Sequence, residues 1–143
     1  MDAAPIRKLV DAALAEGRDA LTELEGLAIL EAMGVPTARR HFVKDSKEAA
    51  TKSLLPGPRA VVKVISPEIL HKTEVGGVAI VPNESEAIAD AIRVMEGKFA
   101  GQKVEGYTIN EFVPFEPRLG HEIIVGYRFA PDFGPVVSFG PGG

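Results

Sequence analysis

The feature that most constrains the fold is a run of strand-like segments near the end of the chain. Residues 107–113 read "YTINEFV", residues 121–129 read "HEIIVGYRF" and residues 134–139 read "GPVVSF". No helical pattern separates these segments. Parallel neighbours in a sheet need a long crossover connection, usually a helix, whereas antiparallel neighbours do not. The run therefore predicts antiparallel pairing and an α+β fold, rather than a doubly wound parallel sheet.

Helical and strand segments alternate before this run. Helical spacing of apolar residues predicts a helix within the first 16 residues, with Ile6, Leu9, Val10, Ala13 and Leu14 on one face. A second helix should begin at "TELE", where Thr22 can cap it and Glu25 stands at the capping-box position. Further strands are expected at 41–44, 59–65 and 76–81, and further helices at 45–54 and 83–97. The last of these helices should have Asn83 as its cap and Gly97 at its end.

Composition excludes several functional classes. The 143 residues carry a net charge of −4, which favours neither a nucleic acid nor an anionic membrane as partner. No apolar run approaches 20 residues and no signal peptide is recognisable. The absence of cysteine removes disulfides and thiolate zinc sites. A cytoplasmic protein is the expectation.

Lys63 is a lone cation on a strand of valines and isoleucines, in "RAVVKVI". Such a lysine either extends to solvent from an edge strand or holds an anion. The loop that follows ends in Gly76 and Gly77. Glycines allow a backbone to approach a ligand closely and to present N–H groups to phosphate, although a Gly-Gly pair is also an ordinary turn.

His71 lies in the same loop, beside Lys72. The chain has 3 histidines. His41 and His121 lie too far from His71 in the sequence to suggest a metal-binding pattern, so no metal ligand is assigned. A neutral imidazole can accept a phosphoryl group, and Lys72 could screen the incoming charge. The alternative is that His71 hydrogen-bonds a loop carbonyl.

Two carboxylates stand in the later strands. Glu111 could accept the amino group of adenine, or it could be a charge on an edge strand. Glu122, at the start of its strand, could equally be solvated.

Three stretches resemble one family. "VVKVISPEILHKTEVGGVAI", "HEIIVGYRFAPDFGPVVSFGPGG" and "ALTELEGLAILEAMGVPT" are similar to the ATP-grasp domain of ADP-forming (NDP-forming) acyl-CoA synthetases, or acetate–CoA ligases. The resemblance covers roughly residues 18–143. It implies an ATP-grasp fold that binds ATP or ADP with Mg²⁺ between two lobes, the smaller of them at about residues 60–113.

The resemblance also implies roles for single residues. Lys63 falls where the family holds nucleotide phosphates, and His71 on the histidine that takes a phosphoryl group and passes it to ADP. Gly76 and Gly77 would give the loop freedom to reach the phosphates. Glu111 and the backbone of Val113 fall at the hinge that reads adenine, and Glu122 near positions used around ribose and phosphates.

The expected activity is phosphate transfer between a phosphohistidine and ADP or ATP, coupled to acyl-CoA formation or cleavage. The expected partners are CoA-binding and ligase domains or subunits, an acyl-CoA or carboxylic acid, and phosphate, in an oligomeric enzyme. The family continues past the "FGPGG" at the end of this sequence into strands with acidic magnesium ligands. We therefore expect residues 1–143 to be the N-terminal part of an ATP-grasp domain, inactive in isolation. The alternatives are a regulatory ATP-grasp module of a protein-lysine acetyltransferase-like protein and a non-catalytic interaction module.

Overall fold

The computed structural model describes residues 3–69, 72–116 and 123–141. The chain divides into two compact units, residues 1–112 and 113–143. Each unit is described by itself.

The first unit is built on a four-stranded sheet, β1-β4-β2-β3, in which every neighbouring pair is antiparallel. Its strands are β1 (Arg40–Val43), β2 (Arg59–Ile65), β3 (Val78–Pro82) and β4 (Gly106–Glu111). The sheet includes β1, so this unit contains residues that precede the expected smaller lobe at about residues 60–113, whose bounds stay a prediction.

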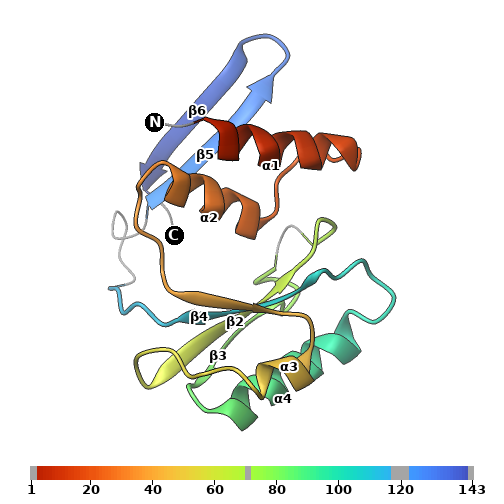
Figure 1. Cartoon of the computed structure of the whole chain (residues 1–143), viewed down its shortest axis with the longest axis vertical. Coiled ribbons are helices and arrows are strands. Elements are labelled where there is room, and N and C mark those ends of the chain that lie inside the picture. The colour runs from red at the N-terminus through yellow and green to blue at the C-terminus, as the bar shows by residue number, and fades with distance from the viewer. Residues whose placement is uncertain (1–2, 70–71, 117–122, 142–143) are drawn as a thin grey trace. The chain divides into compact units, whose positions relative to one another are not determined.

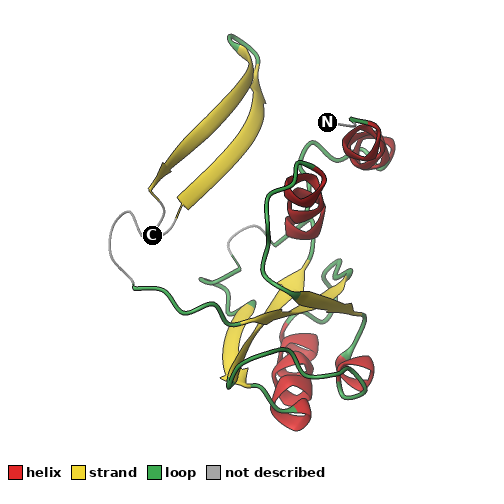
Figure 2. Ribbon diagram, turned by 60° about the vertical axis from the view of Figure 1, so that its left-hand side comes forward, coloured by secondary structure: helices red, strands yellow, loops and turns green. Residues whose placement is uncertain are grey.

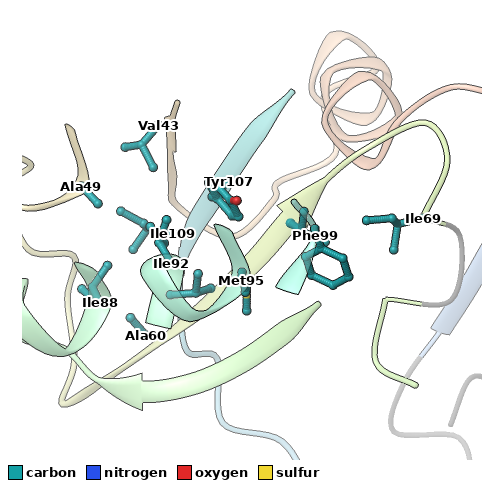
Figure 3. Close-up of a cluster of buried hydrophobic side chains, with 12 residues drawn as sticks. Val43, Ala49, Ala60, Ile69, Ile88, Ile92, Met95, Phe99, Tyr107 and Ile109 are labelled. Carbon is teal, nitrogen blue, oxygen red and sulfur yellow. The ribbon is translucent and has the colours of Figure 1, made fainter. Parts of the chain in front are cut away.

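Helices lie on both sides of this sheet (Figures 1 and 2). α3 (Ser46–Ala49) and α4 (Ser85–Lys98) lie on one side, and α1 (Ala4–Ala15) and α2 (Glu23–Ala32) on the other. The main core lies between the sheet and α4. Figure 3 shows how Ile88, Ile92 and Met95 of α4 meet side chains from β1, β2 and β4. The other buried members of this cluster include Val43, Ala49, Ala60, Val62, Val64, Phe99, Tyr107 and Ile109.

The start of α2 confirms the capping box. The Thr22 hydroxyl accepts a hydrogen bond from the Glu25 amide at 3.4 Å, and the Glu25 carboxylate accepts one from the Thr22 amide at 2.7 Å. Both bonds satisfy amide groups that the first helical turn leaves without partners. After the helix, Gly34 takes a φ of +82° and the Val35 amide donates to the Leu30 carbonyl, an arrangement that commonly ends α-helices.

Three helix boundaries differ from prediction. Residue 84, not Asn83, is the N-cap of α4, and Asn83 instead donates to the carbonyls of Leu55 and Gly57. Gly97 lies inside α4, which continues to Lys98. The helix expected over 45–54 shortens to α3, with Asp45 as its N-cap accepting from the Glu48 amide at 2.7 Å.

The second unit contains an antiparallel pair, β5 (Ile123–Ala130) and β6 (Gly134–Pro141). This pairing confirms the antiparallel arrangement predicted for the last segments. Large apolar side chains of the pair are exposed, among them Ile123, Tyr127, Phe129, Phe133, Val137 and Phe139. Among the residues described, no helix combines the length and the apolar character needed to cross a membrane.

Candidate functional site

Lys63 projects from the face of the sheet that does not pack on α4. Along β2, Val62 and Val64 are fully buried in the main core, so the alternate residues Val61 and Lys63 point to the opposite side. In the register, Lys63 lies opposite Val78 on β3 and Thr108 on β4. The lysine is therefore on an interior strand, and the edge-strand interpretation is wrong.

A second lysine meets Lys63 at one carboxylate. Lys63 Nζ lies 2.6 Å from Glu23 Oε1, and Lys72 Nζ lies 2.9 Å from Glu23 Oε2. Glu23 is the first residue of α2, so the contact joins this helix to the sheet and to the loop between β2 and β3. Because one carboxylate binds both ammonium groups, the two lysines lie close enough together to bind a single small anion.

The charges of this triad favour an ionised carboxylate. Burial alone raises the pKa of Glu23, but hydrogen bonds and charge attraction from Lys63 and Lys72 outweigh burial and lower it below its ordinary value of 4.5. At neutral pH the two lysines and Glu23 together carry one net positive charge. The arrangement can thus attract a further anion.

Polar side chains continue beside the triad on β4. Thr108 and Asn110 are buried, at 2% and 8% exposure, on the same face as Lys63. The Asn110 amide donates to Thr108 Oγ1 at 3.0 Å and to the Val61 carbonyl at 3.1 Å. These bonds offset the cost of burying the two side chains and fix their positions.

Gly76 and Gly77 are required by the geometry of the loop. Gly76 has a φ of +65°, which disfavours other residues. A Cβ on Gly77 would lie 2.7 Å from Val64 Cγ1 and 3.1 Å from the Lys72 carbonyl oxygen. The Gly76 amide donates to the Thr73 carbonyl at 3.2 Å and the Gly77 amide to the Lys72 carbonyl at 2.6 Å. Both N–H groups are therefore used inside the loop, and the expectation that they face phosphate does not describe this structure.

Glu111 does not join the lysines. It lies opposite Ala60 in the register, on the face that holds the core, whereas Lys63 and Thr108 share the other face. Its carboxylate accepts a hydrogen bond from the Arg39 amide at 2.9 Å, and its own amide donates to the Arg39 carbonyl. Glu111 thus fastens the chain entering β1 to the end of β4.

The remaining candidate residues are Val113, His71 and Glu122. Val113 is the first residue of the second unit and its side chain is exposed. His71 and Glu122 lie outside the described residues. Among the residues that are described, no group of three or more histidines or carboxylates could hold a metal ion.

Sequence reasoning missed Glu23, Thr108 and Asn110. Glu23 stands 40 residues before Lys63, and no local pattern links the two. Thr108 and Asn110 carried a usable signal, because two polar residues alternate with Tyr107 and Ile109 along a strand.

Comparison with known proteins identifies the family. The sequence profile of the ATP-grasp domain family matches residues 12–143. The chain belongs to this family. The α+β architecture predicted from the sequence is thus an ATP-grasp fold, and the resemblance noted in the sequence is confirmed.

Relatives of this ATP-grasp chain include the β subunit of acetate–CoA ligase [ADP-forming] I from Pyrococcus furiosus, 35% identical over 144 residues that cover 98% of this chain and 60% of the relative. One solved structure is the Ca. Korarchaeum cryptofilum dinucleotide forming acetyl-coenzyme A synthetase 1 with coenzyme A, Ca-AMPCP and HgCl⁺. It has a TM-score of 0.76 and 31% identity, over 96% of this chain and 60% of that chain.

Another structure of that synthetase contains coenzyme A and Mg-AMPPCP, with a phosphohistidine segment pointing towards the nucleotide binding site. Its TM-score is 0.67 at 30% identity, over 96% of this chain and 57% of that chain. The ATP-grasp chain described here therefore spans 60% or less of the length of these relatives.

Proposed function

We propose that this chain is the nucleotide-binding part of an ADP-forming acyl-CoA synthetase. The observation that carries the proposal is the convergence of Lys63 and Lys72 on one anionic group, at 2.6 and 2.9 Å. The relatives reported above are ligases and synthetases of this kind, and one of them is solved with a magnesium-bound nucleotide analogue. None of them is a protein acetyltransferase, so the regulatory alternative is not favoured.

The lysine pair suits the oxygens of a nucleotide phosphate. A carboxylate and a phosphate both present anionic oxygens a short distance apart, and two lysines already hold the carboxylate in the structure. Lys63 is fixed by an interior strand, so its ammonium group needs little reordering when an anion binds. ATP or ADP, bound with Mg²⁺, would supply the phosphoryl donor or acceptor. The described residues offer no ligand set to which Mg²⁺ can be assigned.

Within this proposal, Lys63 and Lys72 bind and orient phosphate by charge and by N–H donation. His71 is adjacent to Lys72 in the sequence, and we assign it the role of phosphoryl carrier. A neutral imidazole nitrogen would attack phosphorus, and the P–O bond to the nucleotide would break as the N–P bond forms. Coenzyme A-binding and ligase domains or subunits, an acyl-CoA or carboxylic acid, and phosphate complete the proposed reaction in an oligomeric, cytoplasmic enzyme.

Nucleotide titration by calorimetry tests the binding role. Replacing Lys63 by alanine should weaken the affinity for Mg-ADP by roughly tenfold or more, which corresponds to about 1.4 kcal/mol. Lys52→Ala is the control, because Lys52 pairs with Glu48 of α3 at 2.9 Å, and α3 lies on the opposite side of the sheet from α2 (Figure 1). Lys52→Ala should leave the affinity unchanged. Equal Mg-ADP affinity in the wild type and Lys63→Ala would refute the assignment.

A further inference from the structure

The backbone of α2 places Glu23 next to Lys63 and Lys72. Contacts other than those with the two lysines hold this backbone in position. The capping box at Thr22 and Glu25 fixes the start of α2. The other end of the helix is tied to β1, because Arg40 Nη1 lies 2.8 Å from Glu31 Oε1. The position of α2 over the sheet therefore has support that is independent of the Glu23 carboxylate.

The Glu23 carboxylate uses both of its oxygens on the lysines. Oε1 accepts from Lys63 and Oε2 from Lys72, so the carboxylate bridges the ammonium groups. A phosphate that bound both ammonium groups at similar distances would lie against this carboxylate, and like charges at such a separation repel strongly. Phosphate and carboxylate cannot both occupy this position favourably.

The side chain has a route out of the site. Glu23 is 30% exposed, so its carboxylate can turn into water without passing through the core. The hydrogen bonds at both ends of α2 are unaffected by such a rotation. Displacement of Glu23 then requires a side-chain movement, not movement of the helix.

We propose that Glu23 is a built-in competitor for the phosphate site, holding Lys63 and Lys72 together until the phosphate of a nucleotide displaces it. This inference rests on the proposed nucleotide-binding function. Glu23 neutralises part of the positive charge of the empty site and sets the affinity for nucleotide below what the lysines alone would give. A residue that only positioned the lysines would have the opposite effect, since its loss would weaken binding.

The test compares Glu23→Gln with the wild type by calorimetric titration of Mg-ADP and of pyrophosphate, a bare phosphate anion. Glutamine keeps the shape of the side chain and removes its charge. The matched control is Glu48→Gln, an ion-paired carboxylate of α3 that contacts Lys52 and the Lys44 amide instead. Circular dichroism confirms that each variant is folded.

We expect Glu23→Gln to bind Mg-ADP about fivefold more tightly than the wild type, while Glu48→Gln changes the affinity less than twofold. In a Lys63→Ala background the gain from Glu23→Gln should shrink, because Glu23 then has one lysine fewer to release. Equal or weaker binding by folded Glu23→Gln, or an equal gain in Glu48→Gln, would overturn the proposal.

The pyrophosphate titration separates this inference from the proposed function. If the wild type binds no Mg-ADP, the proposed function is wrong, and competition between Glu23 and phosphate is tested with pyrophosphate alone. Tighter pyrophosphate binding by Glu23→Gln then still supports displacement. Equal pyrophosphate binding by the two proteins contradicts it.

Discussion

At the scale of single residues, the charge on Glu23 links the stability of the protein to pH. Its pKa is lowered in the folded state because the attraction of Lys63 and Lys72 outweighs the effect of burial. A carboxyl group with a lowered folded-state pKa contributes stability that is fully present above its ordinary value of 4.5. That contribution is lost as the pH falls through the lowered pKa.

Glu23→Gln should therefore reduce the free energy of unfolding at pH 7 by about 0.5–1 kcal/mol, the size expected for a half-exposed ion pair. The difference from the wild type should shrink as the pH falls below 4.5, because the wild-type carboxyl then becomes neutral. Urea unfolding at pH 7 and at several lower pH values measures this difference in the free energy of unfolding. A difference that stays constant across this range would show that the ion pairs do not stabilise the fold.

The two glycines of the loop provide a second residue-scale prediction. Gly77→Ala should destabilise the protein by about 1–3 kcal/mol, because the new methyl group meets Val64 and the Lys72 carbonyl. Gly97→Ala is the matched control, since Gly97 lies inside α4 with no other atom within 4 Å of an added Cβ. This control should stabilise by about 0.5–1 kcal/mol. Thermal unfolding compares them, and equal stability of the two variants would contradict the loop geometry.

At the scale of elements, local patterns predicted most of the fold of the first unit. The capping box at Thr22 and Glu25 involves groups three residues apart, so the sequence contains all the information that it needs. The short run of β-branched residues in 59–65 likewise predicted a strand, and the structure has β2 there. Long-range contacts could not be predicted in this way. The bonds from Asn83 to Leu55 and Gly57 join residues far apart in the chain, and they removed Asn83 from the capping position that its type favours.

The candidate site shows the same difference between local and long-range signals. Lys63 was identifiable because a charge interrupts an apolar strand, and Lys72 because it adjoins a histidine in a loop that ends in a glycine pair. Their common partner Glu23 belongs to a helix, where a first-turn glutamate is ordinary. Only the tertiary structure brings it to the lysines.

Asn83→Ala tests the role that the structure gives to this residue. The variant should lose about 0.5–1.5 kcal/mol of stability, because the half-buried Leu55 and the exposed Gly57 both lose the hydrogen-bond donor to their carbonyls. Helix content should stay the same, since the cap of α4 lies at residue 84. Circular dichroism and urea unfolding measure the two quantities. A loss of helix signal with the loss of stability would instead support Asn83 as the cap.

At the scale of the whole molecule, the first unit contains the lysine pair and the second contains an exposed hairpin. The chain spans 60% or less of the length of the relatives reported above, so the complete reaction is part of the proposed function. Two facts support the proposal, one from the tertiary structure and one from the sequence. The tertiary structure shows the Glu23 carboxylate held between Lys63 and Lys72, and the sequence places His71 next to one of these lysines.

The most direct measurement of the central claim is the transfer of labelled phosphate to His71. The complete enzyme, of which residues 1–143 are the proposed N-terminal part of the ATP-grasp domain, is incubated with Mg²⁺ and ATP labelled at the γ-phosphate, and acid-labile phosphate is mapped by mass spectrometry. We expect label on His71 in the wild type, none in folded His71→Ala, and at least tenfold slower labelling in Lys63→Ala, with ATP formation from acyl-CoA, ADP and phosphate lost alongside. A folded His71→Ala protein that still makes ATP at the wild-type rate, or Lys63→Ala labelled as fast as the wild type, would contradict the account.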